Sequence, residues 1–170
     1  MAVTSHVYPT ALSVWAPGSA TVATCLNPTT DTIAAGLCTA SAATWGATQW
    51  AYAYVNAVTG AYTEVTTGGG YTSGYANRQA LTTFTWGITA TANVLMWTCT
   101  SPSPISFGAS TTISAASMFL YDKTGHSASA DTNSWAIAII DFGGTVSSTS
   151  GAFTYTVASS PNGLAYWTAS

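Results

Sequence analysis

The chain has 170 residues and a net charge of −3 at pH 7, and only seven of its residues carry a full charge, five acidic and two basic. Charged residues make up 4% of the chain, against about a quarter in an ordinary soluble domain. This composition argues against a nucleic-acid partner, because counterion release requires a basic stripe that Arg78 and Lys123 cannot supply.

The length suits a single domain over residues 1–170. Within it, residues 1–30 are expected to form an N-terminal arm or long loop, because Ala16 to Thr30 is rich in small residues and interrupted by Pro. No basic and apolar leader pattern follows Met1, so we expect no signal peptide and synthesis in a cytoplasm. Apolar runs such as Ala136 to Ile140 are too short to span a bilayer, and no membrane partner is expected.

Alternation of apolar and polar residues between turn-forming clusters predicts strands along most of the chain. In chain order they are Thr32–Thr39, Leu81–Thr89, Val94–Cys99, Ser117–Tyr121, Ala136–Phe142, Gly151–Val157 and a last one around Leu164 and Tyr166. The runs at 94–99, 117–121 and 136–142 are almost continuously apolar, which predicts strands buried on both faces. Gly143–Gly144 and Ser147–Gly151 predict a hairpin loop between the last long runs.

One short helix is expected around Gln49 to Asn56, with Thr48 as its N-cap. Enrichment in Thr and aromatic residues favours strand over helix elsewhere. Regularly spaced strands without a helical pattern predict an all-β fold, either an antiparallel β-sandwich or a jelly-roll-like barrel.

The three cysteines, Cys25, Cys38 and Cys99, are odd in number and form no CxxC motif. A secreted disulfide framework usually has an even and denser set. We therefore expect buried free thiols. One disulfide with one free thiol stays open as the alternative.

The sequence gives only weak signals for a catalytic or a metal-binding site. His126 and Asp131 could be written into a Ser-His-Asp triad, but no G-x-S-x-G elbow is present. Asp122, His126 and Asp131 could approach one another in one loop, but the chain has no clustered ligand pattern. Asp122 and Asp141 end predicted strands, where Asp commonly caps a turn. We expect no catalytic residue, no metal and no cofactor, and a hydrolase with dispersed acids is the enzymatic alternative.

The aromatic content is the strongest pointer to a binding surface, with seven Trp and nine Tyr. Trp and Tyr are enriched at interfaces and on sugar-binding platforms. Sandwich cores also use Trp, and Trp86, Trp97 and Trp135 are expected there. For Trp45 and Trp50 core and interface both stay open. The candidate interface residues are Trp15, Trp45, Trp50, Tyr52 and Tyr54.

A series of short turn and strand motifs in a fixed order resembles a known family. The motifs are Thr30–Ile33, Gly36–Thr39, Gly70–Gly74 running into Ala80–Leu81, Phe119–Thr124, Ile140–Gly143, Gly151–Thr154 and Asn162–Leu164. Together they resemble small all-β structural proteins of tailed bacteriophages, over most of the chain from Thr30 onward. Two departures are Lys123, where the family usually has an acid, and a longer, less charged stretch from Trp15 to Pro28.

The resemblance implies a non-enzymatic virion structural protein. We expect a capsid decoration or minor capsid protein that stabilises the head by packing against the major capsid protein or other virion proteins, and that forms a homo-oligomer. A minor tail or neck protein is one alternative. A carbohydrate-binding module for host recognition, motivated by the aromatic cluster, is the other.

Overall fold

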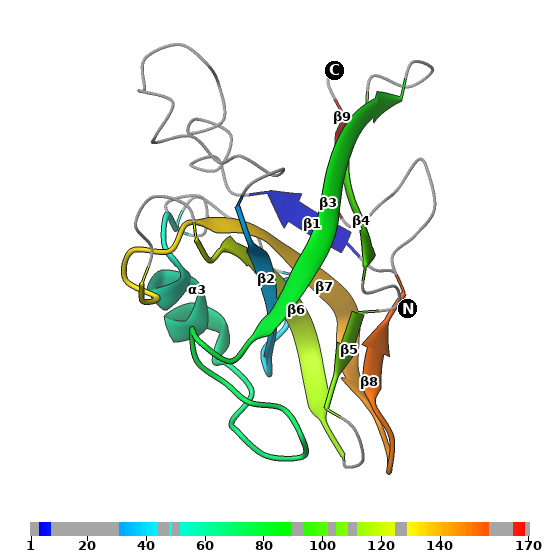
Figure 1. The fold of residues 1–170 in the computed structure, drawn as a ribbon. Coiled ribbons are helices and arrows are strands. Elements are labelled where there is room, and N and C mark those ends of the chain that lie inside the picture. The colour runs from blue at the N-terminus through cyan, green and yellow to red at the C-terminus, as the bar shows by residue number, and fades with distance from the viewer. Residues whose placement is uncertain are drawn as a thin grey trace.

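A computed structural model describes residues 4–7, 31–43, 48, 52–89, 94–101, 105–108, 112–124, 129–156 and 165–168. In these ranges the chain forms nine strands and one helix. The strands are β1 (Thr4–Val7), β2 (Ile33–Cys38), β3 (Gln79–Thr89), β4 (Val94–Ser101), β5 (Ile105–Phe107), β6 (Ser114–Asp122), β7 (Ala136–Ser147), β8 (Phe153–Tyr155) and β9 (Ala165–Thr168), and the helix is α3 (Val55–Tyr62) (Figure 1).

The strands form two antiparallel sheets. The larger sheet has the order β1-β7-β6-β2-β3-β4-β9, and the smaller one pairs β5 with β8. The two edge strands of the larger sheet, β1 and β9, lie in contact. No ladder joins them among the described residues, so the sheet does not close into a barrel. The predicted all-β class is confirmed, in the form of a sandwich-like packing of two sheets.

The central strands of the larger sheet are buried on both faces. All six residues of β2, the last eight of β6 and the first seven of β7 are buried. One face packs against β5 and β8 through Ile105, Phe107 and Phe153. The opposite face packs against α3 through Val55, Val58 and Tyr62, and Figure 1 shows this helix beside the sheet. The two-faced burial expected from the apolar runs at 117–121 and 136–142 is therefore confirmed.

Gly36 in β2 allows a close approach between two strands. It lies opposite Phe119 of β6 in the ladder. A Cβ at this position would overlap the Phe119 ring and lie 3.0 Å from Cδ of Arg78. Phe119 is fully buried, so its ring has no solvent to move into. Glycine at position 36 thus makes room for both side chains.

Gly36→Ala is expected to destabilise the fold by about 1–3 kcal/mol, because overpacking in a dense core forces strained side-chain positions. Urea unfolding measures the change. Gly60→Ala is the matched control, since a Cβ at Gly60 in α3 meets nothing within 4 Å. That substitution is expected to be neutral or to stabilise by about 0.5–1 kcal/mol. A Gly36→Ala variant as stable as the wild type would contradict this account of the contact.

The helix begins later than the sequence predicted. It starts at Val55, with Tyr54 in extended geometry at the N-cap position, so the expected range from Gln49 overlaps it only at its end. The reason is a competing pairing: Ala53 accepts a hydrogen bond from the Ala136 backbone, and Tyr54 forms a β-bridge with Trp135. These bonds hold residues 53 and 54 in an extended conformation. Thr48 is helical, but the residues that follow it, 49–51, lie outside the described ranges.

The hairpin predicted at Gly143–Gly144 is wrong. Both glycines lie inside β7, with φ values of 76° and 151°. Ala115 of β6 pairs with Val146, and Ser117 of β6 pairs with Asp141. β7 therefore has more residues between these two pairs than β6 has, and the excess forms a bulge in β7. Residues 148–152 do connect β7 to β8, but β8 pairs with β5 instead of β7.

The other strand predictions agree with the structure where it describes the chain. β2, β3, β4, β6, β8 and β9 each fall on or within three residues of a predicted strand, whereas β7 starts at Ala136 as predicted but runs five residues past Phe142, to Ser147. β5 had no predicted counterpart. β1 was not predicted: residues 4–7, inside the stretch expected to be an arm, pair with Ala138 to Asp141 of β7. Residues 8–30 lie outside the described ranges.

Candidate functional site

The placement of charge is the most distinctive property of the molecule. All seven charged side chains fall within the described residues, and none of them is exposed. Arg78, Asp122 and Asp141 are buried. Asp31, Glu64, Lys123 and Asp131 are half-buried. The few charged side chains of this sequence are therefore either buried or partly covered by the fold, and none of them projects freely into solvent.

Arg78, next to the start of β3, is the centre of an ion cluster with Glu64 and Asp131. Its Nε and Nη2 donate to the two Glu64 carboxylate oxygens at 2.8 and 2.7 Å. Its Nη1 and Nη2 donate to the two Asp131 oxygens at 2.5 and 2.7 Å. Both contacts are therefore bidentate, the geometry that gives Arg–carboxylate pairs their strength. We call these three residues the Arg78 cluster.

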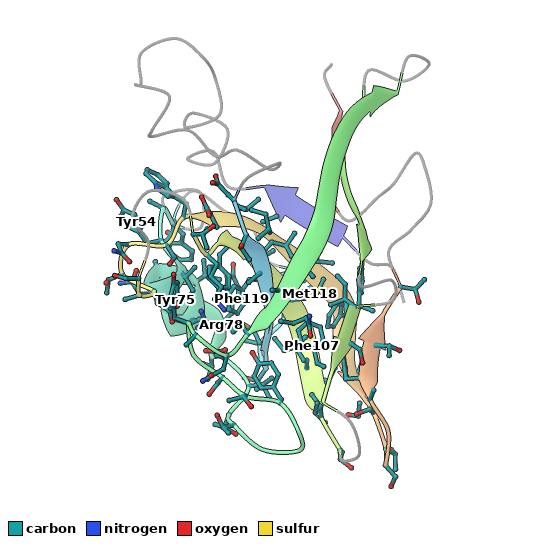
Figure 2. The ribbon with its side chains drawn as sticks, in the orientation of Figure 1. Tyr54, Tyr75, Arg78, Phe107, Met118 and Phe119 are labelled. Carbon is teal, nitrogen blue, oxygen red and sulfur yellow. The ribbon has the colours of Figure 1, made fainter. Side chains whose placement is uncertain are left out.

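The surroundings of the Arg78 cluster shield its cation from water. The guanidinium carbon lies 4.9 Å from the centre of the Phe119 ring and 5.2 Å from that of Tyr121, and Figure 2 shows Arg78 beside Phe119. The Tyr71 hydroxyl donates to Glu64 at 2.8 Å. Burial by itself would lower the pKa of Arg78, but the hydrogen bonds that it donates to Glu64 and Asp131 raise its pKa above the ordinary value. Arg78 therefore stays charged while buried.

Asp141 forms a second buried polar contact at the β7 bulge. Its Oδ2 accepts hydrogen bonds from the Ser41 hydroxyl at 2.5 Å and from the Ala42 backbone N–H. Its Oδ1 accepts from the Gly143 backbone N–H at 2.7 Å. Asp141 thus ties the segment after β2 to the bulge. Asp141 lies inside β7 and its bond to Gly143, two residues on, is made at the bulge, so the turn predicted after Asp141 is not found.

Asp122 caps the other predicted turn, accepting a hydrogen bond from the Thr124 backbone N–H at 3.1 Å. Asp131, considered above for a triad or a metal loop, is instead bound by Arg78. His126 lies outside the described residues. Within the part of the chain that the structure describes, no group of three or more His, Cys, Asp or Glu side chains could hold a metal ion.

A buried thiol and two buried phenol groups, those of Cys38, Tyr71 and Tyr121, belong to the core around the larger sheet. Burial raises the pKa of the Cys38 thiol to about 12, with the Glu64 charge adding to the effect. Burial also raises the pKa of Tyr121 to about 12 and that of Tyr71 above its usual range. The Cys38 thiol is free and buried, as predicted. Cys25 and the side chain of Cys99 lie outside what the structure describes.

These pKa values predict a loss of stability at alkaline pH. The ordinary pKa is 9.0 for Cys38 and 10.0 for the tyrosines, so between pH 9 and about 12 the unfolded chain releases protons that the folded chain keeps. Stability is complete below pH 9 and falls as pH rises, by about 1.4 kcal/mol per pH unit for each proton. Urea midpoints measured from pH 8 to 11 test this. In Cys38→Ala the decline should begin about one pH unit later, and a midpoint that is flat to pH 11 would contradict the account.

The predicted interface residues have different outcomes. Tyr54 is 38% exposed, and its ring centre lies 5.2 Å from that of Trp135 at an angle of 45°. Tyr52 is half-buried and meets Tyr62 edge-on at 6.5 Å. Trp15, Trp45 and Trp50 lie outside the described residues. The fold thus brings Tyr54 together with Trp135, which was expected in the core but is half-buried.

Sequence reasoning missed the Arg78 cluster. A signal for it was present, because a single Arg in so apolar a chain is seldom buried without carboxylate partners. Which acids pair with it could not be read from the sequence, since Glu64 and Asp131 are 14 and 53 residues away.

Comparison with known proteins adds no relative. Searches against models of protein families, curated proteins and solved structures each returned no match to this chain. No helix among the described residues has the length and apolar character needed to cross a membrane.

Proposed function

We propose that the protein is a non-enzymatic structural component of a tailed-bacteriophage virion, a capsid decoration or minor capsid protein that stabilises the head. The observation that carries the proposal is that none of its seven charged side chains is exposed. Repulsion between like-charged copies keeps ordinary soluble proteins apart, and it is weak for a surface whose few charged side chains are all buried or half-buried. Such a surface fits a protein that spends its working life packed against neighbours. The motif series from Thr30 onward points to the same class.

The strength of binding to neighbouring proteins would follow from the apolar area buried at the contact. Neutral Ser, Thr, Gly and apolar surface buried against a neighbour contributes about 25 cal/mol per Å² of apolar area. The cost of desolvation is small, because every charged side chain is already buried or half-buried. Partners would be the major capsid protein, other virion proteins and further copies of this chain. We favour the head over the tail or neck because a cement protein occurs in many copies, each held by small repeated contacts.

The contacts of the acidic side chains also favour a non-enzymatic role. Glu64 and Asp131, the two carboxylates that the Arg78 cluster brings together, both bind one guanidinium, and Asp141 is occupied by Ser41, Ala42 and Gly143. The carbohydrate-binding alternative calls for coplanar exposed rings. The tilt of 45° between Tyr54 and Trp135 does not provide such a platform.

Quantitative mass spectrometry of gradient-purified particles of the phage that encodes the chain tests this function. The chain should be present in many copies, in a fixed ratio to the major capsid protein. Its presence in infected cells together with its absence from particles would overturn the proposal.

Retention on the particle is expected to depend weakly on salt. Salt weakens contacts between exposed charges, and all the charged side chains of this chain are buried or half-buried. Particles washed in low and in high NaCl should keep the same amount of the protein, as measured on gels. Release by moderate salt would show that charged contacts hold it.

A further inference from the structure

Tyr62, in the last turn of α3, carries a hydroxyl group that is buried in the core. The residue is 5% exposed, and its Oη has no hydrogen-bond partner among the described residues. The hydroxyls of Tyr71 and Tyr121, also in the core, donate to protein oxygens at 2.8 and 2.9 Å. A buried hydroxyl left unpaired costs stability, and native structures rarely contain one. The Tyr62 hydroxyl therefore points to a partner that is not a protein group.

Asp141 lies on the face of β7 that packs against α3. Side chains two residues apart along a strand share a face, and Ile139 belongs to the same buried cluster as Tyr62. The segment after β2 links Asp141 to Tyr62. Ala40 in this segment donates its backbone N–H to the Tyr62 carbonyl at 3.0 Å, and the next two residues donate to the Asp141 carboxylate. Both side chains are therefore held beside the same short stretch of chain.

The Asp141 carboxylate has room for one more hydrogen bond. A carboxylate offers about four lone pairs, and three donors reach that of Asp141, two at Oδ2 and one at Oδ1. The electrostatics of Tyr62 agree with a carboxylate nearby. Burial raises the pKa of Tyr62 to about 12, and the charges of Tyr52, Cys38 and Asp141 contribute to the rise. The free lone pair on Oδ1 is thus available on the side of the core that holds the phenol.

We propose that the protein binds a single buried water molecule between the Tyr62 hydroxyl and the Asp141 carboxylate. The water accepts a hydrogen bond from Tyr62 Oη and donates one to Asp141 Oδ1, a pair of roles that calls for a molecule able to donate and accept at once. Buried waters make about three hydrogen bonds, and the Cys38 thiol, in the same cluster as Tyr62, supplies a weaker third partner. The water joins the end of α3 to the β7 bulge, and this inference does not depend on the proposed function.

Tyr62→Phe tests the bridge by the sign of its effect on stability. Removal of a bridged hydroxyl should lower the folding equilibrium constant about 3- to 10-fold, because the water loses one of its partners. Removal of an unpaired hydroxyl should leave the constant unchanged or raise it. Urea unfolding measures the constant. Tyr121→Phe is the matched control, since its hydroxyl donates directly to the Tyr75 carbonyl and its removal should lower the constant by a similar factor.

A crystal structure of the full chain locates the water directly. Its density should lie about 2.5–3.0 Å from both Tyr62 Oη and Asp141 Oδ1, and it should be lost or displaced in crystals of Tyr62→Phe. A Tyr62 hydroxyl bonded to a protein atom, or one with no density beside it, would overturn the inference. So would a Tyr62→Phe variant at least as stable as the wild type. Mass spectrometry of particles is independent of these outcomes, so the proposed function can stand when the water site fails.

Discussion

Arg78→Met is expected to lower the free energy of unfolding by about 3 kcal/mol or more, because removing one partner of a buried ion cluster leaves the other charges uncompensated. Glu64 and Asp131 would then face each other with side chains only 14% and 26% exposed. Methionine fills a similar space against Phe119 and Tyr121, so the loss reports the charge and not a cavity. Urea or thermal unfolding measures it.

Two further variants isolate the cause. The triple substitution Arg78→Met, Glu64→Gln and Asp131→Asn removes all three charges and should recover a large part of the loss, since neutral replacements of buried ion pairs are often tolerated. Lys123→Met is the matched control. Lys123 is half-buried, its ammonium donates to the Ala76 carbonyl at 2.9 Å, and it forms no ion pair among the described residues, so the loss of stability should stay below about 1 kcal/mol. Equal losses for Arg78→Met and Lys123→Met would refute the structural importance of the Arg78 cluster.

Asp141→Ala is expected to cost about 1–3 kcal/mol, because it leaves three donors without their acceptor, and one of them, on Ala42, is buried. These donors are the Ser41 hydroxyl and the backbone N–H groups of Ala42 and Gly143. Asp141 is 1% exposed, so water cannot replace the carboxylate readily. Chemical denaturation gives the overall loss, and hydrogen exchange should show faster exchange at Ala42 and Gly143.

Asp141→Asn provides the graded comparison. Its side-chain oxygen can still accept from one donor, but its amide cannot accept from the others. The loss should therefore lie between those of the wild type and Asp141→Ala. An Asp141→Ala variant within about 0.5 kcal/mol of the wild type, the range of ordinary surface substitutions, would show that the contact carries little stability.

Most of the strands could be predicted from the sequence because their signal is local. The apolar runs at 117–121 and 136–142 required burial on both faces, and the sheet supplies it from β5 and β8 on one side and α3 on the other. The start of α3 could not be predicted in this way. It depends on the pairing of Ala53 and Tyr54 with Trp135 and Ala136, more than eighty residues away along the chain.

The local sequence at Gly143–Gly144 was likewise not enough to predict the structure there. Two glycines between apolar and polar runs predict a turn, and positive φ at Gly143 is indeed required. Whether that freedom serves a hairpin or a bulge depends on the partner strand, and β6 continues past this point to pair with Val146 and Ser147. The Arg78 cluster was hidden for a similar reason, since its members come from three separate segments. The sequence predicts the scarcity of charge, while only the fold reveals that no charged side chain is left exposed.

Cryo-electron microscopy of purified particles tests the central claim most directly. We expect regular density on the capsid lattice that fits this chain, in symmetric contact with its neighbours. Density confined to the tail or neck would remove the head assignment and keep the structural role. Particles without any density for the chain would contradict the account of a virion structural protein.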